Sequence, residues 1–405
     1  MQQLLVDQPY RFVPPRFSRG WALFLRLWLA RHLRKAYAIT SWECQGVERM
    51  QASRKAGHGI LLASNHCRPS DPILLGLNLP KASGDEFLYI MASWHLFKEN
   101  AAMGFLLPRA GIFSVLREGV DRESIKCAAN LLAEAKHPVV LFPEGIVTRS
   151  NDRLHDMMDG VSFIARLGAQ QRAAQNPPGQ VVVHPVFVRY FHEGKIADTV
   201  SPVLDMIEKR FGWQKGDHLP WQERVKRVGQ GMMAVKEVEY LGQAQNGPID
   251  ERIHRLLNHI LPPLEKEWVG GRSDGHAMDR IKRVRTALLP GMIGQTNHAE
   301  EKARRWRQVA DLYFAQQLVC YPEGYLAGDV PPEHWLETVE RFEEDLTDAS
   351  RPHAPLHAVV TIGEAIPCDP TADRRKDGAR MMKALRESME SMRVESLRHR
   401  RTNPA

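Results

Sequence analysis

Short apolar runs alternate with stretches of helical spacing along the first half of the chain. Runs of this length bounded by turn residues are typical of buried strands, and helices separate them, so the pattern predicts an α/β core with a mostly parallel sheet. The expected strands are residues 59–64, 87–93, 112–116, 138–142 and 181–188. The expected helices are residues 73–79, 121–136 and 158–167.

The apolar spacing becomes helical from about residue 206 to residue 350, with helices expected at 249–268, 279–288 and 298–319. Residues 356–366 (LHAVVTIGEAI) return to strand composition, and a final helix is expected at about 372–397. Because the late strand is expected to rejoin the sheet, the helical block is interpreted as an insertion. The predicted fold class is therefore α/β: a mostly parallel mixed sheet flanked by helices, with a large helical insertion before a late strand. The predicted parts are an N-terminal segment (1–45), the α/β core (46–205), the insertion (206–350), and the late strand with the C-terminal helix (351–405).

Residues 18–39 are expected to form a helix that carries both aromatic and basic side chains. Trp21, Leu25 and Trp28 fall on one side at helical spacing, and Arg19 and Arg26 fall on another. Such a helix is typical of a segment that lies in the lipid headgroup region. The alternative is a basic helix that packs on the domain with its arginines in solvent.

Composition places the chain among folded, basic proteins. It has 405 residues, of which 43% are hydrophobic, and a formal net charge of +7. The sequence pI is about 9.2 and the mean hydropathy is −0.37. No uninterrupted apolar run of about 18 residues occurs, which argues against a spanning helix. No acidic residue occurs between Gln8 and Trp42, and seven Arg and Lys residues do. A basic balance of this kind favours polyanionic partners such as anionic lipid.

Five widely spaced cysteines without a CxxC pair argue against a disulfide framework or a zinc site, so no metal is expected. Reduced thiols fit a cytoplasmic location. No secretory signal peptide is recognisable near the N-terminus, because arginines interrupt the apolar stretch and no small-residue cleavage site follows it.

The strongest local motif is Ser-Asn-His-Cys-Arg-Pro-Ser-Asp-Pro at residues 64–72, between an expected strand and an expected helix. Acyl transfer to an alcohol needs a base for the hydroxyl proton, and histidine titrates in a suitable range. A carboxylate nearby would select the imidazole tautomer and stabilise the imidazolium. The spacing therefore suggests His66 as the base and Asp71 as its partner. The alternatives are that Ser70 or Asp71 only caps the following helix, or that Cys67 is a nucleophile.

Three further blocks follow in order. They are the strand that leads to Arg117, the strand that runs into Pro143-Glu144-Gly145, and the apolar strand that contains His184-Pro185. With the His66 motif, this order resembles the lysophospholipid (glycerolipid) acyltransferase family, of which the 1-acylglycerol-3-phosphate acyltransferases are the best known. The resemblance covers roughly residues 46–190, and residues 359–366 are similar to a late strand of that family.

The resemblance implies a role for each block. His66 would be the general base and Asp71 its orienting partner. Arg117 would help to hold the acceptor, often through its phosphate, and a planar guanidinium suits that anion. Glu144 and Gly145 would form the acceptor-binding turn, and Pro185 would belong to the block linked to the acyl donor.

Some residues depart from the family pattern or have a simpler interpretation. Ile146 stands where a small hydroxylic residue is common, and His184 stands where an apolar residue is commoner. Arg117 can instead be a surface residue at a strand end, and Glu144 a charge at a helix N-terminus. His184 is interpreted as a satisfied core or edge histidine and not as a catalyst. The second Pro-Glu-Gly sequence, at 322–324, is interpreted as a turn.

The expected function is transfer of a fatty-acyl group from acyl-CoA or acyl-carrier protein to the hydroxyl of a lysophospholipid in phospholipid biosynthesis, with no cofactor. The expected partners are the membrane lipid acceptor, the acyl donor and an anionic membrane surface at the cytoplasmic face. Alternatives are the same chemistry on an acylated amino-acid lipid or a glycolipid, and a non-catalytic membrane-binding protein. Nucleic-acid binding is disfavoured because the basic residues cluster with tryptophan and leucine.

Overall fold

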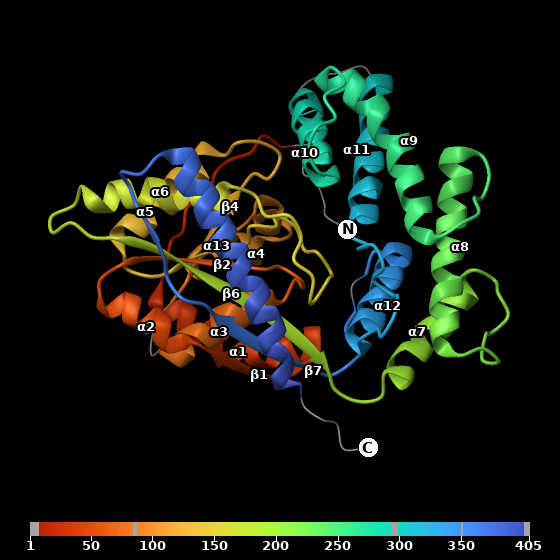
Figure 1. Ribbon diagram of the computed structural model, residues 1–405, viewed down its shortest axis with the longest axis horizontal. Coiled ribbons are helices and arrows are strands. Elements are labelled where there is room, and N and C mark those ends of the chain that lie inside the picture. The colour runs from red at the N-terminus through yellow and green to blue at the C-terminus, as the bar shows by residue number, and fades with distance from the viewer. Residues whose placement is uncertain (1–7, 84–86, 293–298, 350, 401–405) are drawn as a thin grey trace. The chain divides into compact units, whose positions relative to one another are not determined.

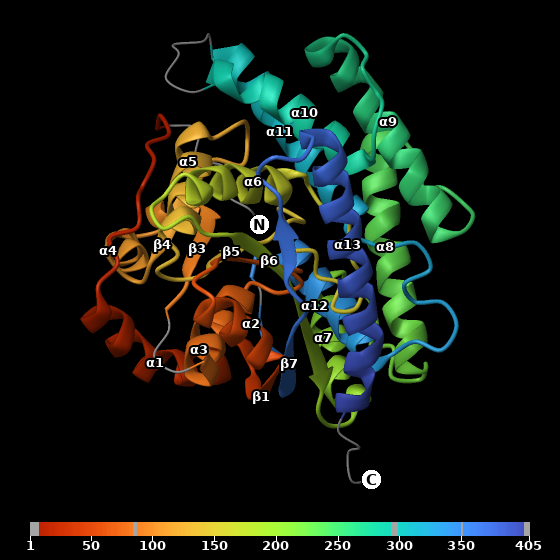
Figure 2. The same ribbon diagram turned by 60° about the vertical axis from the view of Figure 1, so that its left-hand side comes forward.

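The computed structural model describes residues 8–83, 87–292, 299–349 and 351–400. Contacts divide the chain into two compact units (Figures 1 and 2). The α/β unit comprises Arg11–Gly194 and Arg351–Ala405, and the helical unit comprises Lys195–Ser350 with Met1–Tyr10. The insertion predicted from residue 206 therefore begins at Lys195, so α7 (Ile196–Arg210) belongs to the helical unit and not to the predicted core.

An eight-stranded sheet forms the centre of the α/β unit, in the order β1-β7-β6-β2-β5-β3-β4, with β8 also paired to β6. All pairs are parallel except β6 with β7 and β6 with β8. The predicted α/β class is confirmed. The strands are β1 (Ile39–Gln45), β2 (Gly59–Ser64), β3 (Tyr89–Ser93), β4 (Ile112–Val115), β5 (Val139–Leu141), β6 (Val181–His192), β7 (Leu356–Ile362) and β8 (Ile366–Cys368).

Helices cover both faces of this sheet. Helices α5, α6 and α13 pack on one face, and α1, α2 and α3 pack on the other (Figure 2). Every residue of β2 and β6 is buried, which explains why both strands are rich in apolar residues. The helices of this unit are α1 (Arg19–Tyr37), α2 (Val47–Lys55), α3 (Asp71–Ser83), the 3₁₀ helix η1 (Trp94–Lys98), α4 (Ala101–Arg109), α5 (Arg122–Glu134), α6 (Gly160–Ala173), α13 (Arg374–Glu395) and the 3₁₀ helix η3 (Ser396–His399).

Gly59 shows how closely the layers approach at the start of β2. A Cβ atom at Gly59 would lie 2.1 Å from the backbone oxygen of Leu132 in α5. Real Cβ contacts are never this short, so a larger residue would force helix and strand apart. The glycine thus allows α5 to sit directly on the strand that leads to the His66 motif.

The late strand rejoins the sheet as predicted, but as two strands. β7 inserts between β1 and β6, and β8 pairs with an earlier part of β6. Pro185 lies between these two antiparallel partners. Its carbonyl accepts a hydrogen bond from the Gly363 N–H (2.7 Å) in the connection between β7 and β8. In a strand, the backbone nitrogen and the carbonyl of one residue point to the same side. The nitrogen of Pro185 therefore points to the gap between β7 and β8, where no strand partner needs an N–H donor. This placement explains a proline in a central strand.

The predicted N-terminal segment is partly a strand. β1 pairs in parallel with β7, so residues 39–45 belong to the sheet and not to a separate membrane segment. The predicted helix 18–39 ends at Tyr37, where Ala38 takes a left-handed conformation (φ 52°) and turns the chain into β1.

The helical unit consists of α7, α8 (Trp221–Leu241), α9 (Ile249–Val269), α10 (Ala277–Leu288), η2 (Leu289–Met292), α11 (Ala299–Val319) and α12 (Pro332–Thr347). Residue 298, where the third predicted helix begins, lies outside the described residues. One apolar cluster joins α7, α8 and α12, and a second joins the end of α8 to α9, α10 and α11. The 322–324 turn interpretation agrees with the chain between α11 and α12, which forms no helix or strand there.

A sequence pattern recurs every 28 residues in this unit, at Arg224, Arg252 and Arg280, each near the start of a helix. Each arginine donates two hydrogen bonds to a buried glutamate near the end of the preceding helix. The pairs are Arg224–Glu208, Arg252–Glu237 and Arg280–Glu265. Because two-pronged pairs of this kind are directional, they specify which helix ends meet.

Candidate active site

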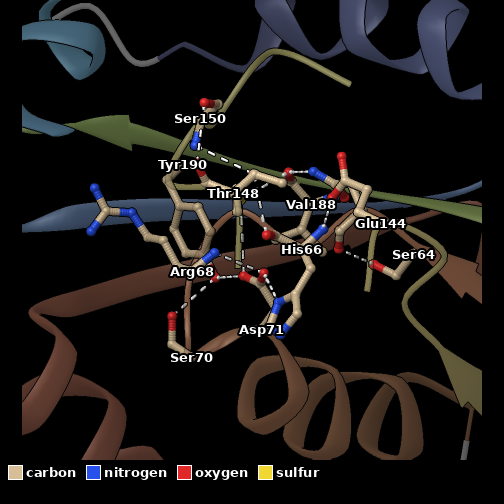
Figure 3. Close-up of polar contacts among 12 residues, drawn as sticks. Ser64, His66, Arg68, Ser70, Asp71, Glu144, Thr148, Ser150, Val188 and Tyr190 are labelled. Atoms are coloured by element: carbon tan, nitrogen blue, oxygen red, sulfur yellow. Dashed lines mark hydrogen bonds and ion pairs between the residues drawn. The ribbon is translucent and has the colours of Figure 1, made fainter. Parts of the chain in front are cut away.

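His66 and Asp71 form a hydrogen-bonded pair at the carboxyl end of β2 (Figure 3). Nδ1 of His66 lies 2.9 Å from Oδ2 of Asp71. The Asp71 side chain is 0% exposed, whereas the His66 side chain is 14% exposed. A carboxylate accepts from the N–H tautomer at Nδ1, so the lone pair of His66 is on Nε2. The pair therefore presents a basic nitrogen that is held in one orientation.

Asp71 begins α3, yet its carboxylate points back to the loop before the helix. Oδ2 also accepts from the Arg68 N–H (2.9 Å), and Oδ1 accepts from the hydroxyl of Tyr190 (2.5 Å). None of these donors is an amide of α3, so the contacts favour the pairing role over the simple helix cap. Cys67 is fully buried, with its Sγ 4.0 Å from Oδ1 of Asp71 and 3.8 Å from the Val188 carbonyl. A thiol enclosed in this way is poorly placed for a nucleophile.

Glu144 holds the backbone of His66. It follows β5, and its two oxygens accept from the amides of His66 (2.6 Å) and His155 (3.0 Å). Burial raises the pKa of Glu144 to about 7, the two amide hydrogen bonds oppose this rise, and the negative charge of Asp71 adds to it. Both oxygens are thus occupied by backbone donors, and the expected role of Glu144 in an acceptor-binding turn stays a prediction.

The turn after Glu144 completes the enclosure of His66. The Thr148 N–H donates to the His66 carbonyl (2.8 Å), so both peptide groups of His66 are held by this turn. Gly145 has φ +71°, and a Cβ there would meet the end of the Met158 side chain at 2.2 Å. The positive φ favours glycine in this turn, and a larger residue would also displace the flexible end of Met158. The ring of Phe142 stacks on the imidazole, with centroids 4.2 Å apart and planes at 26°.

Arg117 reaches the same turn from the carboxyl end of β4. Its Nη1 donates to the Gly145 carbonyl (3.0 Å), and the residue is half-buried, so it is not simply a surface residue at a strand end. The positive charge of Arg117 acts on His95, whose Nδ1 forms a hydrogen bond with the Ser93 hydroxyl (2.8 Å). Burial first, and then the charge of Arg117, lower the pKa of His95 to about 4. A neutral His95 next to Arg117 leaves the positive charge of this corner on the arginine.

Pro185 stands apart from these contacts. It pairs in register with Ala63 of β2, and its role in the sheet is the interruption described above. Its link to the acyl donor stays a prediction. The neighbouring His184 is a satisfied core histidine, as interpreted from the sequence: it is buried, contacts the Ser53 hydroxyl (2.9 Å) through Nε2 and donates from Nδ1 to the Gly363 carbonyl (2.9 Å). Burial lowers its pKa, in keeping with a neutral ring.

Several contributors escape sequence reasoning because they come from distant segments. Tyr190 reaches Asp71 from β6, and Phe142 reaches His66 from the end of β5. Asn65, which stands beside His66, continues the pairing of β2: its side-chain amide exchanges two hydrogen bonds with the backbone of Val188. Its place inside the motif is the one signal in the sequence that points to it. Among the described residues, no group of three or more His, Cys, Asp and Glu side chains is placed to hold a metal ion.

The site residues share one place in the fold. His66, Arg117 and Glu144 follow β2, β4 and β5, and carboxyl ends of parallel strands are where ligands bind in open α/β sheets. The fold and the site thus define an α/β protein with a hydrogen-bonded His–Asp pair at the carboxyl end of its sheet.

Comparison with known families agrees with this class. Residues 41–189 match the family model described as Acyltransferase, and this match confirms the resemblance found in the four sequence blocks. The matched segment runs from β1 into β6 and contains His66, Asp71, Arg117, Glu144 and Pro185, whereas Tyr190 lies one residue beyond it. The family that this segment matches is named for acyl transfer. A comparison with curated protein sequences finds no match.

Proposed function

We propose that the protein transfers a fatty-acyl group from acyl-CoA or acyl-carrier protein to the hydroxyl of a lysophospholipid such as 1-acylglycerol-3-phosphate, in phospholipid biosynthesis. The hydrogen bond between His66 and the buried Asp71 carries the proposal. Nε2 of His66 takes the proton of the acceptor hydroxyl as its oxygen attacks the thioester carbonyl. The C–S bond then breaks, and the imidazolium returns the proton to the leaving thiolate, so the products are the ester and the free thiol.

The remaining site residues have supporting roles in this proposal. Arg117 binds the phosphate of the acceptor, because its guanidinium is directed to the Gly145 turn beside His66. Glu144 and Gly145 shape the turn that receives the acceptor hydroxyls, and Glu144 also holds the His66 amide. Pro185 and its neighbours are assigned to the donor side.

Release of thiol tests this function. Purified protein is incubated with a long-chain acyl-CoA, with and without lysophosphatidic acid, and free thiol is measured while mass spectrometry identifies the lipid product. We expect release that depends on the acceptor and yields phosphatidic acid. If product forms only with an acylated amino-acid lipid or a glycolipid, that lipid is the acceptor and the lysophospholipid is not. No product with any acceptor, from acyl-CoA or from acyl-carrier protein, would favour the non-catalytic membrane-binding alternative.

We also propose that the protein binds the membrane surface through α1 and α4. Ala22 and Leu33 of α1 are buried, whereas Leu27 is 84% exposed and Phe24 is 60% exposed. The ring of Trp21 in α1 packs edge-on against the ring of Phe105 in α4, with centroids 5.4 Å apart, so the exposed apolar surface continues from α1 to α4. The α1–α4 patch consists of Trp21, Leu23, Phe24, Leu27, Trp28 and Phe105, all exposed.

Charge favours a lipid bilayer as the occupant of the α1–α4 patch. Exposed Arg19, Arg31, Arg34 and Lys35 lie on the same helix. Aromatic and aliphatic side chains that enter the interface, flanked by cations that meet anionic headgroups, are the features of interfacial helices. Among the described residues, no helix has the length and apolar character needed to cross a bilayer. The exposed apolar patch and the exposed basic side chains of α1 are both consistent with attachment at a membrane surface.

Vesicle flotation tests the patch. We expect the wild type to float with phosphatidylglycerol-containing vesicles and the double variant Phe24→Glu/Leu27→Glu to remain largely unbound, because two charges would enter the apolar interface. Val120→Glu is the matched control, since Val120 is 80% exposed and lies outside the patch. Equal flotation of the double variant and the control variant would disprove the assignment of the patch.

A further inference from the structure

Tyr190 lies behind Asp71, on the side away from His66 (Figure 3). The residue is fully buried in β6, and its hydroxyl donates to Oδ1 of Asp71, while His66 contacts Oδ2. The Ser70 hydroxyl lies 3.2 Å from the same phenol oxygen. Because the single proton of Tyr190 is given to Asp71, the Ser70 hydroxyl is the donor to Tyr190. The order of donation is thus Ser70 to Tyr190 to Asp71.

The position of the Tyr190 ring is determined by its backbone. The side-chain amide of Asn151 exchanges two hydrogen bonds with the peptide groups of Tyr190: Nδ2 donates to its carbonyl (2.7 Å), and Oδ1 accepts from its N–H (2.6 Å). Asn65 does the same two residues earlier, at Val188. The two asparagines therefore replace a neighbouring strand beyond the end of β2 and keep β6 extended up to Tyr190. The phenol reaches Asp71 from a rigid element.

The Tyr190 hydroxyl remains a donor. Burial, followed by the negative charge of Asp71, raises the pKa of Tyr190 well above 10. The guanidinium of Arg68 lies 5.5 Å from the centre of the Tyr190 ring and adds a second contact to its face. The hydroxyl thus keeps its proton across the range in which histidine titrates.

A buried carboxylate stays ionised only when donors replace the lost water. Asp71 has no exposed surface and depends on the donors that contact it, of which His66, Arg68 and Tyr190 are the closest. The other titratable groups that face it are Cys67 and Glu144. The Cys67 thiol faces Oδ1 at 4.0 Å, but Tyr190 makes the short hydrogen bond (2.5 Å) to this oxygen, which His66 does not contact, and Tyr190 takes no part in the proton transfer.

We propose that Tyr190 is a positioning residue for acyl transfer, which binds Oδ1 of Asp71 and keeps its Oδ2 directed at Nδ1 of His66. The inference rests on the proposed function only in naming the reaction. Tyr190 is fully buried behind Asp71, so it acts through Asp71. The His–Asp pair recognisable in the sequence is therefore a unit of three side chains, His66–Asp71–Tyr190, supported from behind by Ser70.

The test compares Tyr190→Phe with Tyr89→Phe. Phenylalanine keeps the ring, so only the hydroxyl is removed. Tyr89 is the matched control because it is also a buried tyrosine of the same sheet, but it lies in β3 among Phe17 and His137. We expect Tyr190→Phe to reduce kcat by about 10- to 100-fold, the worth of a hydrogen bond to a charged group, with KM nearly unchanged. We expect Tyr89→Phe to keep the wild-type kcat.

The pH dependence separates positioning from packing. Without the phenol, more negative charge remains on Asp71 facing the imidazole, and this favours the imidazolium. The acid limb of the kcat/KM profile should therefore move to higher pH in Tyr190→Phe and stay in place in Tyr89→Phe. A Tyr190→Phe enzyme with wild-type kcat and an unmoved acid limb, whose unfolding midpoint alone is lowered, would overturn the proposal.

An activity-free measurement keeps this proposal distinct from the proposed function. The imidazole of His66 is titrated by NMR in histidine-labelled protein, with the signal assigned by its absence in His66→Ala. A midpoint that moves upward in Tyr190→Phe, but not in Tyr89→Phe, supports the three-residue unit even if no acyl acceptor is found. A midpoint that is the same in both variants would refute it even if the enzyme is an active acyltransferase.

Discussion

Replacing His66 by alanine or Asp71 by asparagine is expected to reduce the acyl-transfer rate by ~10²–10⁴-fold, the contribution typical of a general base. His66→Ala removes the base. Asp71→Asn leaves the base but replaces the acceptor at Oδ2 or Oδ1 with an amide group. The three donors that now converge on a carboxylate would meet an additional donor, so the Nδ1–H tautomer of His66 would lose its support. Initial rates of thiol release at saturating donor measure both losses.

The double variant shows whether the two residues act as one unit. Because Asp71 acts through His66, the acyl-transfer rate of the variant His66→Ala/Asp71→Asn should lie within a factor of a few of the rate of His66→Ala alone. His254→Ala is the control, as an exposed histidine of α9 in the helical unit. Losses that multiply in the double variant would contradict the arrangement, because they would mean that Asp71 contributes independently of the imidazole.

Glu144→Gln is expected to change how the stability of the protein depends on pH. The folded protein holds the Glu144 proton up to a pKa of about 7, whereas the ordinary value is 4.5, because burial disfavours the charge. Between these values the folded state binds more protons than the unfolded state. The contribution of Glu144 to the free energy of unfolding is therefore fully present below pH 4.5 and is lost as the pH rises to about 7. Glutamine does not ionise, so Glu144→Gln should lack this loss.

The measurement is the free energy of unfolding in urea at pH 5 and pH 8. Between these pH values, the variant should gain about 2–3 kcal/mol relative to the wild type, from a shift of this size. At pH 5 the variant should be the less stable of the two, because its NH₂ group faces one of the two backbone amides that Glu144 accepts from. Glu99→Gln removes an exposed carboxylate and serves as the control. A difference that is independent of pH would show that Glu144 is ionised throughout the range.

The apolar strands of the core could be predicted from the sequence because they are buried on both faces. Residues 59–64 form one uninterrupted apolar run, and β2 has those bounds. β1 could not be predicted in this way. Its sequence, ITSWECQ, mixes polar and apolar residues because most of the strand is only half-buried at the edge of the sheet. β7 and β8 were expected as one strand. They are separate because they pair with different parts of β6, and no change in the apolar pattern of residues 356–366 marks the break between them.

Local spacing predicted the site only where the chemistry is local. His66 and Asp71 are five residues apart, and the start of α3 brings them together, so one motif contains both. Arg117 and Glu144 follow strands whose carboxyl ends meet, and the order of the blocks indicated that they converge. Tyr190 lies 119 residues from Asp71, and only the register of β6 against β2 brings the phenol to the carboxylate. Nothing in the residues around Tyr190 distinguishes it from a core tyrosine.

The most direct test of the account is the formation of lipid product by the wild type and by His66→Ala, at equal protein concentration, from acyl-CoA and lysophosphatidic acid. Both proteins should unfold cooperatively, and thiol and phosphatidic acid should appear together in the wild type. The structure predicts that both products disappear in His66→Ala, because no other base is held by a buried carboxylate at this edge of the described sheet. Acyl transfer at the wild-type rate in His66→Ala would contradict the assignment of His66 as the base.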